Sequence, residues 1–260
     1  MKSILLATGL LILILMSSTT QAKSLALTSL NWPPYTGSSL KDLGVTSKIV
    51  ALALYSVGLE LNVVIFPWQR AVLTAKSDKN FQGYFPEYYD QAIEKEFFFS
   101  DPVGSSPLGF IERKDKPVTW ETLDDLKGLR IGTVKGYVNT AEFDAKVASG
   151  ALDAEAVVDD VTNVKKLAAG RLDIAVIDKY VYEYLLNTDP ELAPLKAKLH
   201  FNSRILENKK LYVCLRRDPE GEAALEQLNQ GLKYINVSKI QDMYIRKALD
   251  LPPLDTSPAN

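Results

Sequence analysis

The stretch "LRIGTVKGYVNTAEFDAKVASG", residues 129–150, decides the fold class of this chain. Residues 130–134, near its start, are predicted to form a strand. After a short turn, residues 139–142 (Asn-Thr-Ala-Glu) have the form of a capping box, and the helix that they begin is expected to end near Gly150. A strand that leads through a turn into a helix is the building unit of a parallel sheet with helices on its faces.

The same unit recurs on both sides of this stretch. Before it, we predict strands at 25–30, 61–66 and 81–85, a helix at 45–57 that stops at Gly58, and a second helix that begins at Trp68. After it, we predict strands at 156–158, 173–177 and 210–216 and helices at 161–169, 180–186 and 222–249, the last with a break near Asn236. This alternation predicts an α/β protein.

A charged, proline-containing segment, "ERKDKPVTWETLDDLKG" at 112–128, separates two such cycles. Because domain boundaries fall in segments of this composition, we expect a second lobe to begin here. Ligands of open parallel sheets bind at the carboxyl ends of the strands. The cleft between the two lobes is therefore the expected place for function.

The composition excludes several kinds of partner and cofactor. The 260 residues are 47% hydrophobic and 24% charged, with a formal net charge of −2 and no Lys/Arg block, so no nucleic-acid partner is expected. The single cysteine, Cys214, lies in an apolar run and cannot form an internal disulfide. The single histidine, His200, has no neighbouring residues that suit a zinc site or a Ser-His hydrolase, and neither metal nor cofactor is expected.

The first 22 residues have the anatomy of a secretory signal peptide. Lys2 supplies the positive charge, residues 4–16 are almost wholly apolar, and small polar residues lead to a cleavage site after Ala22. A membrane anchor is the alternative, but the apolar run is shorter than the roughly 20 residues that a spanning helix needs. We therefore expect a free periplasmic protein that begins at Lys23.

Five segments, taken in order, resemble the bacterial extracellular solute-binding proteins of family 3. They are "WPPY" (32–35), "FSDP" (99–102), "LDDLKGLRIGTVKGY" (123–137), "LAAGRLDIAVID" (167–178) and "LYVCLRRDPE" (211–220). The resemblance implies a type II periplasmic-binding-protein clamshell, in which two α/β lobes are joined by two crossovers. Lobe one would comprise residues 23–109 plus 214–260, and lobe two residues 110–213.

The resemblance also implies a function. Such a protein captures a small polar solute, an amino acid or a related compound, and presents it as a monomer to an ABC-type importer in the inner membrane. A ligand-sensing partner of a membrane signalling receptor would look the same in sequence. A periplasmic dehydratase-like enzyme on this fold is the third alternative, with Glu87 or Glu94 as a general acid. Because no nucleophile–base pair is visible, we expect a binding protein and not an enzyme.

The chain departs from the family where amino-acid-binding members place an arginine that clamps the ligand's carboxylate. The matching place, upstream of "FSDP", holds Ile93 and Glu94, and residues 86–88 (Pro-Glu-Tyr) replace the usual small hydroxyl residues. Three explanations stay open. Arg70 has taken over the clamp, or the ligand is an amine or aromatic solute, or the site binds nothing.

Ten residues are expected to contact the ligand: Trp32, Tyr35, Trp68, Arg70, Glu87, Tyr88, Gly136, Tyr137, Asn139 and Asp178. The two tryptophans would stack on the ligand, with a core role as the alternative. The turn at 136–139 would offer backbone amides to an anionic group, although it would equally suit an ordinary strand-to-helix turn. Asp178 matches the family aspartate that holds the ligand's ammonium, and its alternative role is a helix N-cap.

Overall fold

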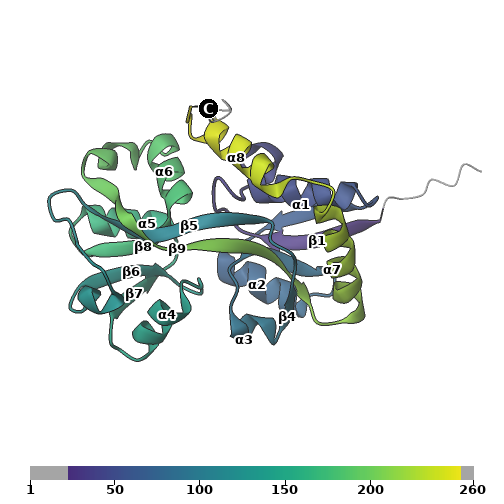
Figure 1. Cartoon of the computed structure of the whole chain (residues 1–260), viewed down its shortest axis with the longest axis horizontal. Helices are drawn as coiled ribbons and strands as arrows, with labels where there is room; N and C mark the ends of the chain where they lie inside the picture. Colours follow the sequence, from purple (N-terminus) through teal and green to yellow (C-terminus); the bar gives the residue numbers. More distant parts are fainter. Residues whose placement is uncertain (1–22, 253–260) are drawn as a thin grey trace, which may run out of the picture.

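A computed structural model of the chain describes residues 23–252. The predicted signal peptide lies outside these residues. Two α/β lobes lie side by side, and two long strands run between them (Figure 1). Within residues 23–252, no helix has both the length and the apolar character that a membrane crossing requires.

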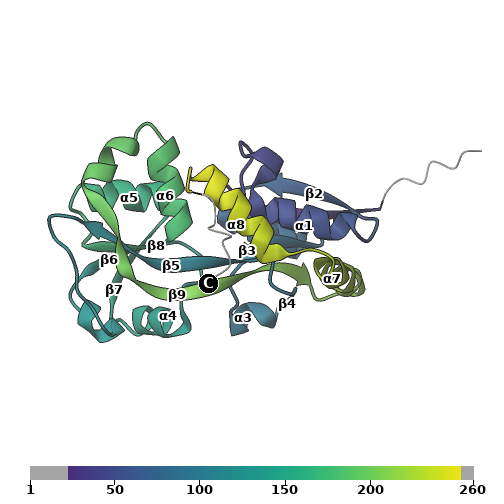
Figure 2. The same cartoon turned by 45° about the horizontal axis from the view of Figure 1, so that its top comes forward.

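Lobe one is built on the parallel strands β2–β1–β3. Its elements are β1 (Ser24–Ser29), α1 (Val45–Tyr55), β2 (Glu60–Ile65), α2 (Trp68–Ser77), β3 (Gly83–Glu87), α3 (Gln91–Glu94), β4 (Phe97–Phe99), α7 (Pro219–Leu232) and α8 (Val237–Ala248), with a 3-10 turn at Lys41–Leu43. The last two helices return to this lobe from the end of the chain and pack against α1 (Figure 2). The predicted break near Asn236 is confirmed, because Asn236 caps the first turn of α8.

Lobe two repeats the pattern with the parallel strands β8–β6–β7. Its elements are β6 (Arg130–Val134), α4 (Ala141–Ala148), β7 (Asp153–Val157), α5 (Asp160–Ala168), β8 (Ile174–Asp178) and α6 (Lys179–Thr188), with 3-10 turns at Leu123–Leu126 and Ala193–Ala197. The strand predicted at 130–134 is confirmed to the residue. The capping-box prediction is wrong by one position, because Thr140 and not Asn139 caps α4 by accepting a hydrogen bond from the Phe143 amide.

The two lobes are connected by β5 (Gly104–Arg113) and β9 (Leu199–Arg216), which pair antiparallel over most of their length. β9 also pairs with β3 and β4 in lobe one, and β5 pairs with β8 in lobe two, so one sheet runs through the molecule. Both strands cross between the lobes in Figures 1 and 2. The proposed lobe boundaries after residues 109 and 213 fall inside these strands.

The "FSDP" segment, just before β5, is hydrogen-bonded to β9 and to α7. The Ser100 hydroxyl accepts a hydrogen bond from the Val213 amide at 3.0 Å, and the Ser100 amide donates to the Val213 carbonyl at 3.0 Å. The Asp101 amide donates to Asn229 Oδ1 at 2.7 Å, which ties the segment to α7. Its role in this chain is therefore structural. Cys214, next along β9, is fully buried, as the apolar run around it predicted.

Candidate functional site

A small cavity lies between the lobes, at the carboxyl ends of their strands. Its lining comes from both lobes and from β9: Leu30, Trp32, Trp68, Pro86, Glu87, Tyr88, Tyr137, Val138 and Leu211. The cavity measures about 30 Å³. Ligand pockets measure roughly 300 Å³ or more, so a solute can enter only if the surrounding side chains or the lobes move apart.

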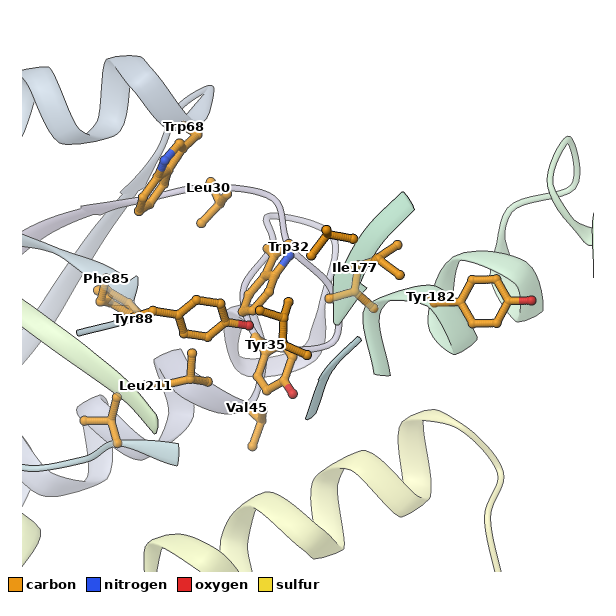
Figure 3. Packing of buried hydrophobic residues seen from close by; sticks show 14 of the residues in the cluster. Leu30, Trp32, Tyr35, Val45, Trp68, Phe85, Tyr88, Ile177, Tyr182 and Leu211 are labelled. Atoms are coloured by element: carbon orange, nitrogen blue, oxygen red, sulfur yellow. The ribbon is translucent and has the colours of Figure 1, made fainter. Parts of the chain in front are cut away.

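Aromatic rings form the walls of this cavity. Trp32 stacks on Tyr35 with ring centroids 4.6 Å apart, and meets the edges of Tyr88 at 6.1 Å and Tyr137 at 6.4 Å. In Figure 3, Trp32 and Tyr35 lie side by side between Tyr88 of lobe one and the strand of lobe two that carries Ile177. Trp32 and Trp68 line the cavity, whereas Tyr35 is fully buried and does not line it, so contact of these residues with a ligand stays a prediction.

Trp68 links the two lobes directly. Its indole Nε1 donates a hydrogen bond to the Gly136 carbonyl at 2.8 Å, and its ring meets Tyr137 at 5.7 Å. Gly136 has a backbone φ of +82°, a conformation that residues other than glycine rarely adopt. The turn after β6 therefore brings its carbonyl to the tryptophan of lobe one.

Asp178 ends β8 and joins the lobes through hydroxyl groups. One carboxyl oxygen accepts from the Val181 amide at 2.8 Å, so Asp178 caps α6. The other accepts from the Tyr35 hydroxyl at 3.1 Å and from Ser106 Oγ at 2.5 Å. Ser106 also bonds to the Tyr88 hydroxyl. The N-cap interpretation of Asp178 is confirmed, and its contact with a ligand stays a prediction.

Three carboxyl groups are buried around the cleft: Asp178 is 2% exposed, Glu87 5% and Asp160 6%. Glu87, at the end of β3, accepts from the Tyr84 hydroxyl at 3.1 Å and from the Tyr88 amide at 2.8 Å. Asp160 is the first residue of α5, and the Trp32 indole is close enough to lower its pKa. Glu87 and Asp178 are the last residues of β3 and β8, and Asp160 lies three residues after the end of β7.

Burial changes the acid–base behaviour of these groups, because a low-dielectric setting disfavours the charged form. Burial raises the pKa of Glu87 to about 8, although hydrogen bonds from Tyr88 and Tyr84 oppose the shift. Burial, together with the charges of Asp178 and Asp159, raises the pKa of Asp160 to about 7. Burial also raises the pKa of Asp178 to about 7, against the hydrogen bond from Ser106.

Five predicted residues do not line the cavity: Tyr35, Arg70, Gly136, Asn139 and Asp178. Tyr35, Gly136 and Asp178 take part in hydrogen bonds between the lobes, and the other two are Arg70 and Asn139. Arg70 is exposed on α2, and its guanidinium lies 4.8 Å from the centre of the Phe66 ring. Asn139 is buried, but its amide and its side chain both donate to Asp144 at 2.8 Å, so these groups are engaged within lobe two. Neither geometry supports the anion-holding roles that were expected of these residues.

Residues 86–94, which stand where amino-acid-binding members have their clamp, lie partly at the cleft and partly on the surface. Glu87 and Tyr88 face the cleft, whereas the Tyr89 hydroxyl donates to Glu94 at 2.6 Å on the surface. Asp90 caps the short helix α3. Only the first part of this segment therefore belongs to the candidate site.

Sequence reasoning missed three members of the site, Ser106, Tyr84 and Asp160. Asp160 had a usable signal, because it follows a predicted strand of a parallel sheet and opens a helix. Ser106 lies on β5, which the sequence pattern did not predict as a strand, so its position could not be inferred. Tyr84 was predicted to be in a strand, but nothing indicated that its hydroxyl would meet Glu87.

Solved structures of ligand-binding proteins have the same architecture. The GluR0 ligand-binding core from Nostoc punctiforme in complex with (L)-glutamate is 18% identical, with 87% of this chain and 99% of that chain covered and a TM-score of 0.67. A histidine kinase sensor domain with similarity to periplasmic binding proteins is 17% identical, with coverages of 88% and 98% and a TM-score of 0.72. An amino acid ABC transporter substrate-binding protein from Streptococcus pneumoniae, bound to L-arginine, is 17% identical, with coverages of 87% and 94% and a TM-score of 0.69.

The chain has the periplasmic-binding-protein fold. The expected clamshell architecture is thereby confirmed. At these identities the likeness is one of fold and does not carry ligand or partner from those proteins to this one. No protein-family model matches the sequence, and no curated protein matches it either.

Proposed function

We propose that this protein is a periplasmic solute-binding protein that captures a small polar solute, an amino acid or a related compound, for an ABC-type importer. The observation that carries the proposal is the aromatic-walled cavity between two lobes, at the carboxyl ends of both sets of parallel strands. The comparison with an amino acid ABC transporter substrate-binding protein supports the same function.

The connection between the lobes suits a hinge. β5 and β9 run from one lobe to the other, while direct contacts across the cleft include the Trp68–Gly136 and Tyr35–Asp178 hydrogen bonds. Breaking such contacts and bending two strands would open the cleft, and a bound solute would let it close again. The aromatic walls would then stack on the solute, and the buried polar groups would fix its orientation.

Sensing is the second candidate function. It is favoured by the likeness to a histidine kinase sensor domain and to the VFT2 domain of Bordetella pertussis BvgS, the latter with a TM-score of 0.68. The partner would then be a signalling receptor in place of a permease. In either case we propose binding without turnover of the solute, with Gly136 and Tyr137 as ligand neighbours and Arg70 outside the site.

A thermal-shift screen of the chain from Lys23 onward tests the proposal. The compounds are amino acids, amines, small acids and aromatic metabolites. A solute at 100 times its Kd should add about 2.7 kcal/mol to the free energy of unfolding. X-ray scattering with that solute should then show a smaller radius of gyration. If no compound in any class raises the melting temperature, the proposed function is wrong.

A further inference from the structure

Acidic groups outnumber basic groups around the cleft. Glu87, Asp160 and Asp178 are each more than nine-tenths buried there. Among the described residues, one buried lysine stands near them, Lys209, whose ammonium lies 5.3 Å from the centre of the Tyr88 ring. That ammonium also lies 3.7 Å from Glu207. With the carboxyls ionised, the cleft would therefore carry a net negative charge.

Asp160 has the fewest hydrogen bonds of the three carboxyls. An ionised carboxylate accepts about four hydrogen bonds. Asp178 accepts three hydrogen bonds and Glu87 two, whereas no hydrogen bond to the Asp160 side chain is seen within residues 23–252, and the nearby Trp32 indole only lowers its pKa. Trp32 itself lines the cavity, so this under-satisfied acceptor lies next to the space between the lobes.

The aromatic walls suit the same kind of ligand. Trp32, Trp68, Tyr88 and Tyr137 all line the cavity. The face of an aromatic ring attracts a cation, and the attraction is strongest for tryptophan and in sites from which water is excluded. Rings and carboxylates together form a cage that favours positive charge. A carboxylate ligand needs basic side chains to pair with its negative charge. Among the described residues, the cavity lining contains no arginine or lysine.

We propose that the solute is a small organic cation, an amine that carries no carboxylate, held by Asp160, Asp178 and Glu87 within the aromatic cage. The inference rests on the proposed solute-binding function and names the class of solute for that same site. Asp178 and Tyr35 would exchange their mutual hydrogen bond for bonds to the ligand's ammonium group. Asp160 would gain the donor that it lacks.

Binding of a cation to these groups should release protons. At neutral pH the buried carboxyls are partly protonated, and an ammonium ion beside them stabilises their charged form. The other titratable groups that interact with them are Asp90, Asp159, Lys209, Cys214, Tyr35, Tyr84, Tyr88, Tyr137 and Tyr180. Affinity for the amine should therefore rise as the pH increases from 6 to 8.

Matched pairs of compounds test the inference by calorimetry on the chain from Lys23 onward. Each pair differs only in the α-carboxylate: cadaverine and lysine, putrescine and ornithine, agmatine and arginine, tyramine and tyrosine. We expect the amine of at least one pair to bind about tenfold or more tightly than its amino acid. We also expect a heat of binding that depends on the buffer's ionisation enthalpy, with net proton release.

The outcomes separate this inference from the proposed function. If amino acids bind as tightly as their amines, or if a neutral solute alone binds, the ligand class is wrong while the solute-binding function stands. If nothing binds in this set or in the broader screen, both are wrong. Absence of proton release on amine binding would also overturn the role of the buried carboxyls.

A pair of variants assigns the effect to the cleft. Asp160→Asn keeps the shape of the side chain and removes its charge, so it should weaken amine binding by about 30-fold or more. Asp153→Asn removes a charge from the exposed start of β7 in the same lobe and should leave the affinity unchanged. Equal affinities of the two variants would exclude Asp160 from the site.

Discussion

Asp178→Asn should make the protein less sensitive to pH. Asparagine can still cap α6 through its side-chain oxygen, because Asn and Asp are comparable N-caps. Its amide group can donate to the hydroxyls of Tyr35 and Ser106, since each hydroxyl also accepts hydrogen bonds. The variant therefore resembles the protonated form of Asp178 at every pH.

The size of the effect follows from the pKa of the buried carboxyl, which burial raises from 3.8 to about 7. The folded protein holds this proton more tightly than the unfolded chain does. The free energy of unfolding therefore falls as the pH rises from about 4 to about 7. Between pH 5 and pH 8 the loss is on the order of 2–3 kcal/mol for this one group. Glu87 and Asp160, whose pKa values burial also raises, add losses of the same sign.

Urea unfolding at pH 5 and pH 8 measures this difference. The parent protein should lose stability between these pH values, and Asp178→Asn should lose on the order of 2–3 kcal/mol less. Asp153→Asn, at the exposed start of β7, is the matched control and should behave as the parent does. An Asp178→Asn variant whose stability falls as steeply as that of the parent would refute the reasoning.

Three further predictions concern the cleft and the start of the mature chain. Trp68→Phe removes the hydrogen bond to the exposed Gly136 carbonyl and should lower the free energy of unfolding, measured in urea, by about 1 kcal/mol. An unchanged free energy would mean that this bond does not stabilise the contact between the lobes. Arg70→Ala should lower the free energy of unfolding by at most about 1 kcal/mol, through the lost contact with Phe66, and should leave the ligand affinity measured by calorimetry unchanged. A tenfold loss of affinity would support the hypothesis that Arg70 clamps the ligand. Mass spectrometry of protein from the periplasm should find Lys23 as the first residue, and a soluble protein that keeps residues 1–22 would contradict the predicted signal peptide.

Much of the architecture could be predicted because local pattern and fold agree. The run Arg130–Val134 is a strand as predicted, and Gly58 and Gly170 follow the ends of the helices that they were predicted to stop. The strands that connect the lobes were harder. β5 contains Pro107 and two glycines, and the first part of β9 is rich in charge, so only the second part of β9, at 210–216, has a strand pattern. They are strands because they pair with each other across the sequence, which local composition does not reveal.

The site was predictable where a residue's position on an element decided its role. Trp32, Trp68 and Asp178 all follow or end strands, and all three lie at the cleft. Arg70 and Asn139 have similar positions in sequence, but neighbouring side chains, Phe66 and Asp144, determine where they point. Both contacts are local, four and five residues along the chain, but the sequence pattern does not tell which neighbouring side chain each residue meets.

Tryptophan fluorescence gives the most direct test that a solute binds between the lobes. Of the three tryptophans, Trp32 and Trp68 line the cavity, whereas Trp120 packs against Phe110 and Arg204 in lobe two. In a Trp120→Phe variant, all tryptophan emission therefore reports on the cleft. Titration with the compound that gives the largest melting shift should produce a saturable change in emission, with the same Kd as calorimetry. A compound that binds by calorimetry but leaves this emission unchanged would contradict a binding site between the lobes.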